Sequence, residues 1–158
     1  MSSSVTQQDG TRPATASRAQ VDPRGPRFGA AVTTVVLAAT LVFIGSTAGT
    51  VLIAWQTVVF ALGALVGLHA QPYGVFFRRV IRPRLAPPAE LEDAAPPRFA
   101  QAVGLVFLVV ALVAALAGVT VVATVAVAFA LAAAFLNAVF CFCLGCEMYL
   151  LGKRLTHR

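Results

Sequence analysis

The stretch FGAAVTTVVLAATLVFIGSTAGTVLIAWQTVVFALGALVGL, residues 28–68, contains no Asp, Glu, Lys or Arg over 41 positions. A helix needs roughly 20 apolar residues, each rising about 1.5 Å, to cross the hydrocarbon core of a bilayer. The stretch is therefore long enough for two spans, and Gly45 and Gly49 mark the turn between them. We predict transmembrane helices at about residues 28–46 and 50–69.

A second uncharged stretch covers the 48 residues 99–146. The same arithmetic predicts two more spans at about 99–117 and 121–146, with a turn near Gly118 and a last helix that runs past the hydrocarbon to about Leu151. Membrane strands alternate in polarity over roughly 9–11 residues, and these runs are longer and unbroken. The predicted fold is all-α, a polytopic membrane protein with four transmembrane helices in a bundle.

Composition excludes an ordinary soluble domain. Of the 158 residues, 59% are hydrophobic and 11% are charged, whereas soluble domains carry about 25% charged residues. The mean hydropathy is +0.85. The chain must therefore expose much of its surface to lipid.

The distribution of charge predicts the topology. All 12 basic residues lie in three segments, namely residues 1–27, 71–98 and 152–158, while the two other turns have none. The positive-inside rule places these segments, with both termini, in the cytoplasm. The net charge of +6 is thereby explained without nucleic acid. We expect a disordered basic tail at 1–27, a membrane domain at 28–151 with a cytoplasmic loop at 71–98, and a basic tail at 152–158.

The middle loop has an amphipathic segment at residues 73–84. Its apolar pairs are Phe76 with Val80 and Phe77 with Ile81, and its basic arc consists of Arg78, Arg79 and Arg82. Such an arc attracts anionic lipid headgroups at about 1 kcal/mol per basic residue. Two interpretations stay open: a loop that only sets topology, and a site for lipid or a docking partner.

Small residues predict where helices pack closely. The second span contains Gly63 and Gly67, and the fourth has alanines at every fourth position: Ala126, Ala130, Ala134 and Ala138. Close packing of this kind serves either the bundle itself or a homo-oligomer. The amides expected to hydrogen-bond neighbouring helices are Gln56, Gln101 and Asn137.

The three cysteines lie together at Cys141, Cys143 and Cys146. In a continuous helix, Cys143, Cys146 and Glu147 share nearly one face. Three interpretations are open: apolar packing, thiol redox or sulfur chemistry, and a metal site. A closed zinc site needs four ligands and the motif supplies two, so no metal or cofactor is predicted.

A redox role meets an electrostatic objection in that continuous helix. The thiols would lie toward a helix C-terminus, where the dipole and the neighbouring Glu147 both disfavour a thiolate. A basic neighbour would then be required, and the preferred partner for Glu147 is Arg98 or an arginine of the middle loop. The candidate site residues are therefore Cys143, Cys146, Glu147 and Arg98. Cys141 is given no function.

Several motifs resemble the domain of unknown function 4395 family of small bacterial membrane proteins, over roughly residues 20–152. They are Asp22-Pro23-Arg24-Gly25-Pro26-Arg27-Phe28, Gln71-Pro72-Tyr73-Gly74, Arg82-Pro83-Arg84-Leu85, Pro96-Pro97-Arg98-Phe99-Ala100-Gln101, Leu136-Asn137-Ala138 and Cys143-Leu144-Gly145-Cys146-Glu147. The resemblance implies a multi-pass location in the bacterial inner (plasma) membrane. Family members look to be encoded, in some genomes, near thioredoxin-like proteins and sulfurtransferases, which implies a partner of that kind.

Two functional hypotheses follow. In the first, the Cys143 and Cys146 pair exchanges electrons or sulfur with a soluble thioredoxin-like or sulfurtransferase partner at the cytoplasmic side. In the second, the protein is a non-catalytic membrane scaffold or an oligomeric small-solute conduit, and its cysteines only pack.

Overall fold

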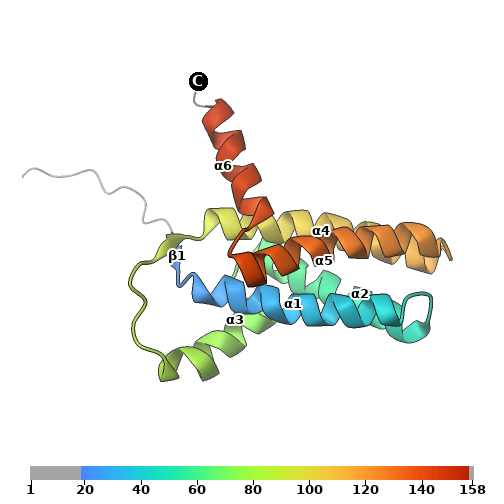
Figure 1. Ribbon diagram of the computed structural model, residues 1–158, viewed down its shortest axis with the longest axis horizontal. Coiled ribbons are helices and arrows are strands. Elements are labelled where there is room, and N and C mark those ends of the chain that lie inside the picture. The colour runs from blue at the N-terminus through green and yellow to red at the C-terminus, as the bar shows by residue number, and fades with distance from the viewer. Residues whose placement is uncertain (1–18, 157–158) are drawn as a thin grey trace, which may run out of the picture.

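The structure, a computed structural model, describes residues 19–156. Four long helices lie side by side in a bundle (Figure 1): α1 (Arg24–Val42), α2 (Thr47–Ala61), α4 (Ala95–Leu116) and α5 (Thr120–Phe140). A π-helical turn, η1 (Leu62–Val66), continues α2. All four, with that extension, are long and apolar enough to cross a membrane. The predicted all-α, four-span architecture is confirmed.

The turns at the far end of the bundle lie where the glycines predicted them. Gly45 and Gly118 have φ angles of 80° and 75°, a backbone region that glycine enters at little cost. α1 and α4 each begin four residues before their predicted start, at Arg24 and Ala95. Pro96 and Pro97 are accommodated in the first turn of α4, where a missing N–H leaves no helical hydrogen bond unmade.

The predicted disordered tail extends too far toward α1. Residues 1–18 lie outside the described part, but β1 (Gln20–Val21) pairs antiparallel with β2 (Glu92–Asp93). Next to this ladder, Arg24 Nη2 and Asp22 Oδ2 form an ion pair at 2.9 Å. The same guanidinium donates from Nη2 to the Ala86 carbonyl at 3.0 Å. The strand pairing and this hydrogen bond hold residues 19–24 against the middle loop, and the local ion pair orients Arg24.

The middle loop is helical where its amphipathic pattern predicts helical turns. It forms α3 (Pro72–Phe76), a π-helical turn η2 (Phe77–Ile81) and a 3-10 turn η3 (Arg82–Arg84). The Phe28 ring of α1 lies 6.1 Å from the Phe76 ring and 5.8 Å from the Phe77 ring, between ring centroids. Phe77 is buried, so this contact fastens the loop to the bundle.

The core runs along the bundle and consists of aliphatic side chains and alanines. Leu37, Ile53, Leu108 and Val127 are fully buried, and Ala126 and Ala130 of the alanine stripe belong to the same cluster. A Cβ on Gly63 would lie 2.8 Å from Oε1 of Gln101. The Gly63 face is therefore used for packing η1, the continuation of α2, against α4 within the chain.

The fourth predicted span, 121–146, is too long. α5 ends at Phe140, and Cys141 adopts a left-handed conformation with φ 56°. A left-handed residue stops an α-helix and redirects the chain. A separate helix, α6 (Leu144–Thr156), then leaves the bundle and runs across the direction of the long helices (Figure 1).

Candidate functional site

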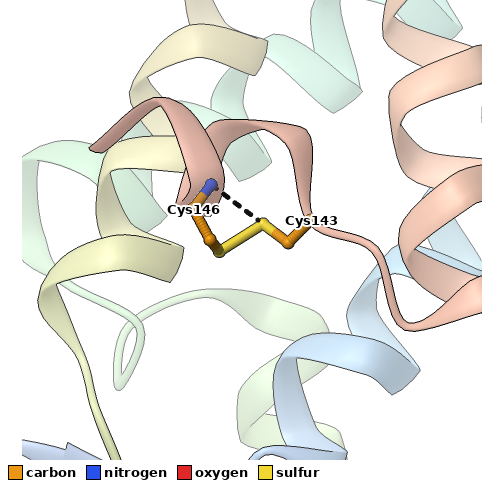
Figure 2. Close-up of a disulfide and its surroundings, with 2 residues drawn as sticks. All are labelled: Cys143 and Cys146. Atoms are coloured by element: carbon orange, nitrogen blue, oxygen red, sulfur yellow. Dashed lines mark hydrogen bonds between the residues drawn. A yellow bond between two sulfur atoms is a disulfide. The ribbon is translucent and has the colours of Figure 1, made fainter. Parts of the chain in front are cut away.

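Cys143 and Cys146 form a disulfide at the start of α6, with their Cα atoms 5.2 Å apart. Figure 2 shows the bond closing the first turn of that helix. Both residues are half-buried, whereas Cys141 is exposed and free. The cysteine pair predicted from the sequence is thus brought together, and Cys141 is not part of it.

Cys143 caps the N-terminus of α6. Its carbonyl oxygen accepts the Glu147 backbone N–H at 3.0 Å, the first hydrogen bond of the helix. Its Sγ accepts the Cys146 backbone N–H at 3.3 Å, drawn as the dashed line in Figure 2. A side-chain acceptor at this position satisfies an N–H group that the helix itself leaves unpaired. The Cys143 sulfur therefore lies at the positive end of the α6 dipole.

This geometry reverses the electrostatics predicted from the sequence. A helix that continued through the cysteines would place the thiols near its C-terminus. Since α5 stops at Phe140, the same residues begin a new helix. Glu147 lies in the first turn of α6, where a carboxylate is favoured by the dipole. Its carboxylate is exposed and needs no cationic partner.

Arg98 is bonded elsewhere. Its guanidinium donates from Nε to the Ala64 carbonyl at 2.8 Å and from Nη2 to the Leu65 carbonyl at 2.9 Å. These carbonyls end the α2–η1 helix and lack intrahelical donors, which explains why a guanidinium lies there. In the described part of the chain, Arg98 forms no hydrogen bond or ion pair with Glu147. The structure thus joins Cys143, Cys146 and Glu147 but not Arg98.

The first turn of α6 is packed directly on α4. Gly145 is buried, and a Cβ there would lie 2.6 Å from both Cα and Cβ of Ala100. The Phe99 and Tyr149 rings add a contact with 5.8 Å between centroids. The disulfide is therefore fixed to the bundle through Gly145.

A cavity of about 270 Å³ lies in the bundle and reaches Cys143. Every spanning helix contributes to it, and α6 contributes its first turn. The wall is mainly apolar and includes the rings of Phe60, Phe107 and Phe129. Its polar side chains are Thr33, Gln101 and Asn137. Cys143 lines this cavity and Cys146 does not.

Of the three amides predicted to hydrogen-bond neighbouring helices, Gln56 does so and Gln101 bonds Gln71, the residue that precedes α3. Gln56 is fully buried; its Nε2 donates to Thr33 Oγ1 at 3.3 Å, and its Oε1 accepts from the Tyr73 hydroxyl at 2.9 Å. Gln101 Oε1 accepts from Gln71 Nε2 at 3.0 Å. Within the described residues, the Asn137 amide has no hydrogen-bond partner, and it lines the cavity. No motif in the sequence indicates this cavity, because the cavity depends on how five helices meet.

The arginines of the middle loop differ in their hydrogen bonding. The Arg78 guanidinium donates to the Leu68 and His69 carbonyls, while the side chains of Arg79 and Arg82 are exposed. The middle loop, β1 and α6 all lie at the same end of the bundle (Figure 1). The basic residues and the disulfide therefore share one end, and the uncharged turns lie at the other.

Together, the helices and the disulfide define a small multi-pass membrane protein with a cysteine pair at one end of its helical bundle. The chain belongs to the family described as Domain of unknown function (DUF4395), whose profile matches residues 21–154. Neither the curated proteins nor the solved structures that were compared contain a match.

Proposed function

We propose that the protein is a thiol–disulfide exchange protein of the bacterial inner membrane. Its Cys143–Cys146 disulfide reacts at the cytoplasmic face with a soluble thiol protein of the thioredoxin-like or sulfurtransferase type. The observation that carries the proposal is the disulfide at the N-terminus of α6, with Cys143 Sγ accepting the Cys146 N–H. Helix N-termini favour the thiolate, which is the reactive form of a cysteine.

The two sulfurs have different surroundings, and this suggests an order of steps. A partner thiolate attacks Cys146 Sγ, the S–S bond breaks, and Cys143 leaves as a thiolate. The helix N-terminus and the Cys146 N–H stabilise that leaving group, which speeds exchange. The partner's second thiol then attacks its own sulfur in the mixed disulfide and releases Cys146. The partner has lost two electrons, and Cys143 and Cys146 have gained them.

The test is a redox titration of the purified protein in lipid nanodiscs. Mixtures of reduced and oxidised dithiothreitol set the potential, and maleimide mass shifts count the free thiols. We expect two thiols to appear together as the mixture becomes more reducing, while Cys141 is labelled throughout. A Cys141→Ser variant should give the same midpoint, which makes it the matched control.

Single variants test the order of steps. With oxidised thioredoxin as the probe, Cys143→Ser should accumulate a mixed disulfide through Cys146, and Cys146→Ser should accumulate less. Reversed yields would overturn the order but not the exchange. A pair that never changes state across the titration would contradict the proposed function and favour the scaffold hypothesis.

A further inference from the structure

The cavity beside Cys143 extends from the membrane surface into the bundle. On α5 its lining runs from Phe129 to Asn137, and eight residues of helix rise about 12 Å. One end of the cavity is therefore at the disulfide, and the other lies among Phe60, Phe107 and Phe129 at hydrocarbon depth. A ligand that fills the cavity would therefore extend from the disulfide to hydrocarbon depth.

The volume and the lining limit what can occupy the cavity. Ligand pockets commonly measure about 300–1,000 Å³ and combine an apolar wall with a few polar groups. A cavity of about 270 Å³ lies just below this range, and its volume suits a ligand no larger than one substituted ring. The phenylalanine rings offer stacking surfaces. The Asn137 amide offers an unused N–H donor for a ring oxygen.

The proposed exchange leaves a chemical requirement. Once Cys143 and Cys146 have taken two electrons from a soluble thiol, a second reactant must remove them before another turnover. Because Cys143 and not Cys146 lines the cavity, electrons would leave through Cys143 on the membrane side. The acceptor must be apolar, able to take two electrons, and sized for a single ring.

We propose that a lipid-soluble quinone occupies this cavity and oxidises the reduced Cys143 and Cys146 pair. This inference rests on the proposed exchange function and names its membrane-side reactant. The ring lies among the phenylalanines, Asn137 donates a hydrogen bond to a quinone oxygen, and an isoprenoid tail remains in the lipid.

The step balances in electrons and protons. The Cys143 thiolate adds to the quinone ring and forms an S–C bond. Cys146 then attacks Cys143 Sγ, which forms the S–S bond and breaks the S–C bond, so that the electron pair stays on the ring. The ring oxygens take two protons, equivalent to those of the two thiols. The net change is two thiols and one quinone to one disulfide and one quinol.

The experiment follows quinone reduction by the reduced protein without oxygen. Protein in nanodiscs is reduced with dithiothreitol, freed of it, and mixed with a decyl-substituted benzoquinone. Quinone loss is read from its ultraviolet absorbance, and disulfide formation from maleimide mass shifts. We expect one quinone consumed per disulfide formed, with a rate that saturates as the quinone concentration rises. All proteins carry Cys141→Ser, because this exposed thiol could itself add to the quinone ring. In that background the double variant Cys143→Ser/Cys146→Ser should consume none.

A substitution that fills the cavity tests quinone binding independently of thiol exchange. Ala134 lines the cavity, whereas Ala132 on the same helix is exposed and does not. Ala134→Leu should raise the half-saturating quinone concentration about tenfold or more, and Ala132→Leu should leave it unchanged. Both should keep the dithiothreitol midpoint of the unmodified protein, which shows that the fold and the exchange function are intact.

The outcomes distinguish the two proposals. Normal dithiothreitol exchange with no quinone reduction, or with unsaturable reduction that Ala134→Leu does not alter, would overturn the quinone site and leave the exchange function standing. A pair that does not exchange with dithiothreitol would overturn both.

Discussion

Gly145 and Gly152 lie two turns apart on α6 but meet different surroundings. A Cβ on Gly145 would come within 2.6 Å of Ala100, whereas a Cβ on Gly152 meets nothing within 4 Å. The first position therefore requires glycine for close approach of two helices, and the second does not.

The two glycines should respond oppositely to alanine. Gly145→Ala must push α6 away from α4, and we expect it to lower the free energy of unfolding by about 1–3 kcal/mol, the usual cost of overpacking. Gly152→Ala should raise it by about 0.4–1 kcal/mol, because alanine restricts the unfolded chain. Denaturant unfolding in one detergent compares them, and equal effects would contradict the packing of Gly145 on Ala100.

Cys141 shows a second constraint at the scale of one residue. Its φ of 56° places the backbone in the left-handed region. This conformation costs roughly 1–2 kcal/mol for a residue that carries a Cβ. Cys141→Gly should therefore stabilise the protein or leave it unchanged, and Cys141→Val should destabilise it. Thermal unfolding measures both, and a more stable valine variant would show that the left-handed turn is absent.

The ion pair between Asp22 and Arg24 should be sensitive to acid. The Arg24 side-chain hydrogen bond lowers the pKa of Asp22 below its ordinary value of 3.8, although burial acts in the opposite direction. Because its pKa is lower in the folded state, ionised Asp22 stabilises the fold at pH values above its unfolded-state pKa. This stabilisation is lost as the pH falls through the folded-state pKa. Lowering the pH from about 4 to about 2 should therefore reduce the free energy of unfolding of the unmodified protein more than that of the Asp22→Asn variant. Unfolding curves across that interval test it, and parallel losses would rule out the contact.

At the scale of elements, the spanning helices could be predicted from the sequence and α6 could not. Uncharged length is a local property, so residues 28–68 and 99–146 are sufficient to indicate four spans. The break after Phe140 is marked by neither glycine nor proline. It depends on distant partners: Arg27 Nε donates to the Ala138 carbonyl at 3.1 Å, and Ala100 receives Gly145. The cysteine pair was visible in the sequence, but its place at a helix N-terminus was not.

The helix α6 has an apolar stripe that remains largely exposed in the described part of the chain. Leu144, Met148, Leu151 and Leu155 recur at helical spacing and are 39–67% exposed. Lys153 lies on the opposite side of the helix by the same spacing. A helix with these two faces that leaves the bundle sideways matches an element lying in the membrane interface.

We therefore expect Leu151 to face the acyl chains and Lys153 to face water. In a Trp55→Phe background, Leu151→Trp fluorescence should be quenched by brominated lipid chains several-fold more than Lys153→Trp fluorescence. The two variants share one helix and one probe, so each is the control for the other. Equal quenching would mean that α6 stands away from the membrane.

At the scale of the whole molecule, the two ends of the bundle differ in charge. The middle loop, residues 19–27 and α6 contain every described basic residue, and the α1–α2 and α4–α5 turns contain none. Basic loops remain on the cytoplasmic side during insertion. The disulfide lies at the basic end, so the proposed reaction would take place with cytoplasmic partners.

The orientation can be tested with one cysteine at each end of the bundle. In the Cys141→Ser background, Val119→Cys in the uncharged turn should react with a membrane-impermeant maleimide in intact spheroplasts, and Arg84→Cys in the basic loop should react only after permeabilisation. Both positions are exposed, so a difference in labelling reports the side of the membrane and not burial. The reverse pattern would place the disulfide outside the cell. Any partner would then have to be a thiol protein of that compartment, although the geometry of Cys143 and Cys146 would be unchanged.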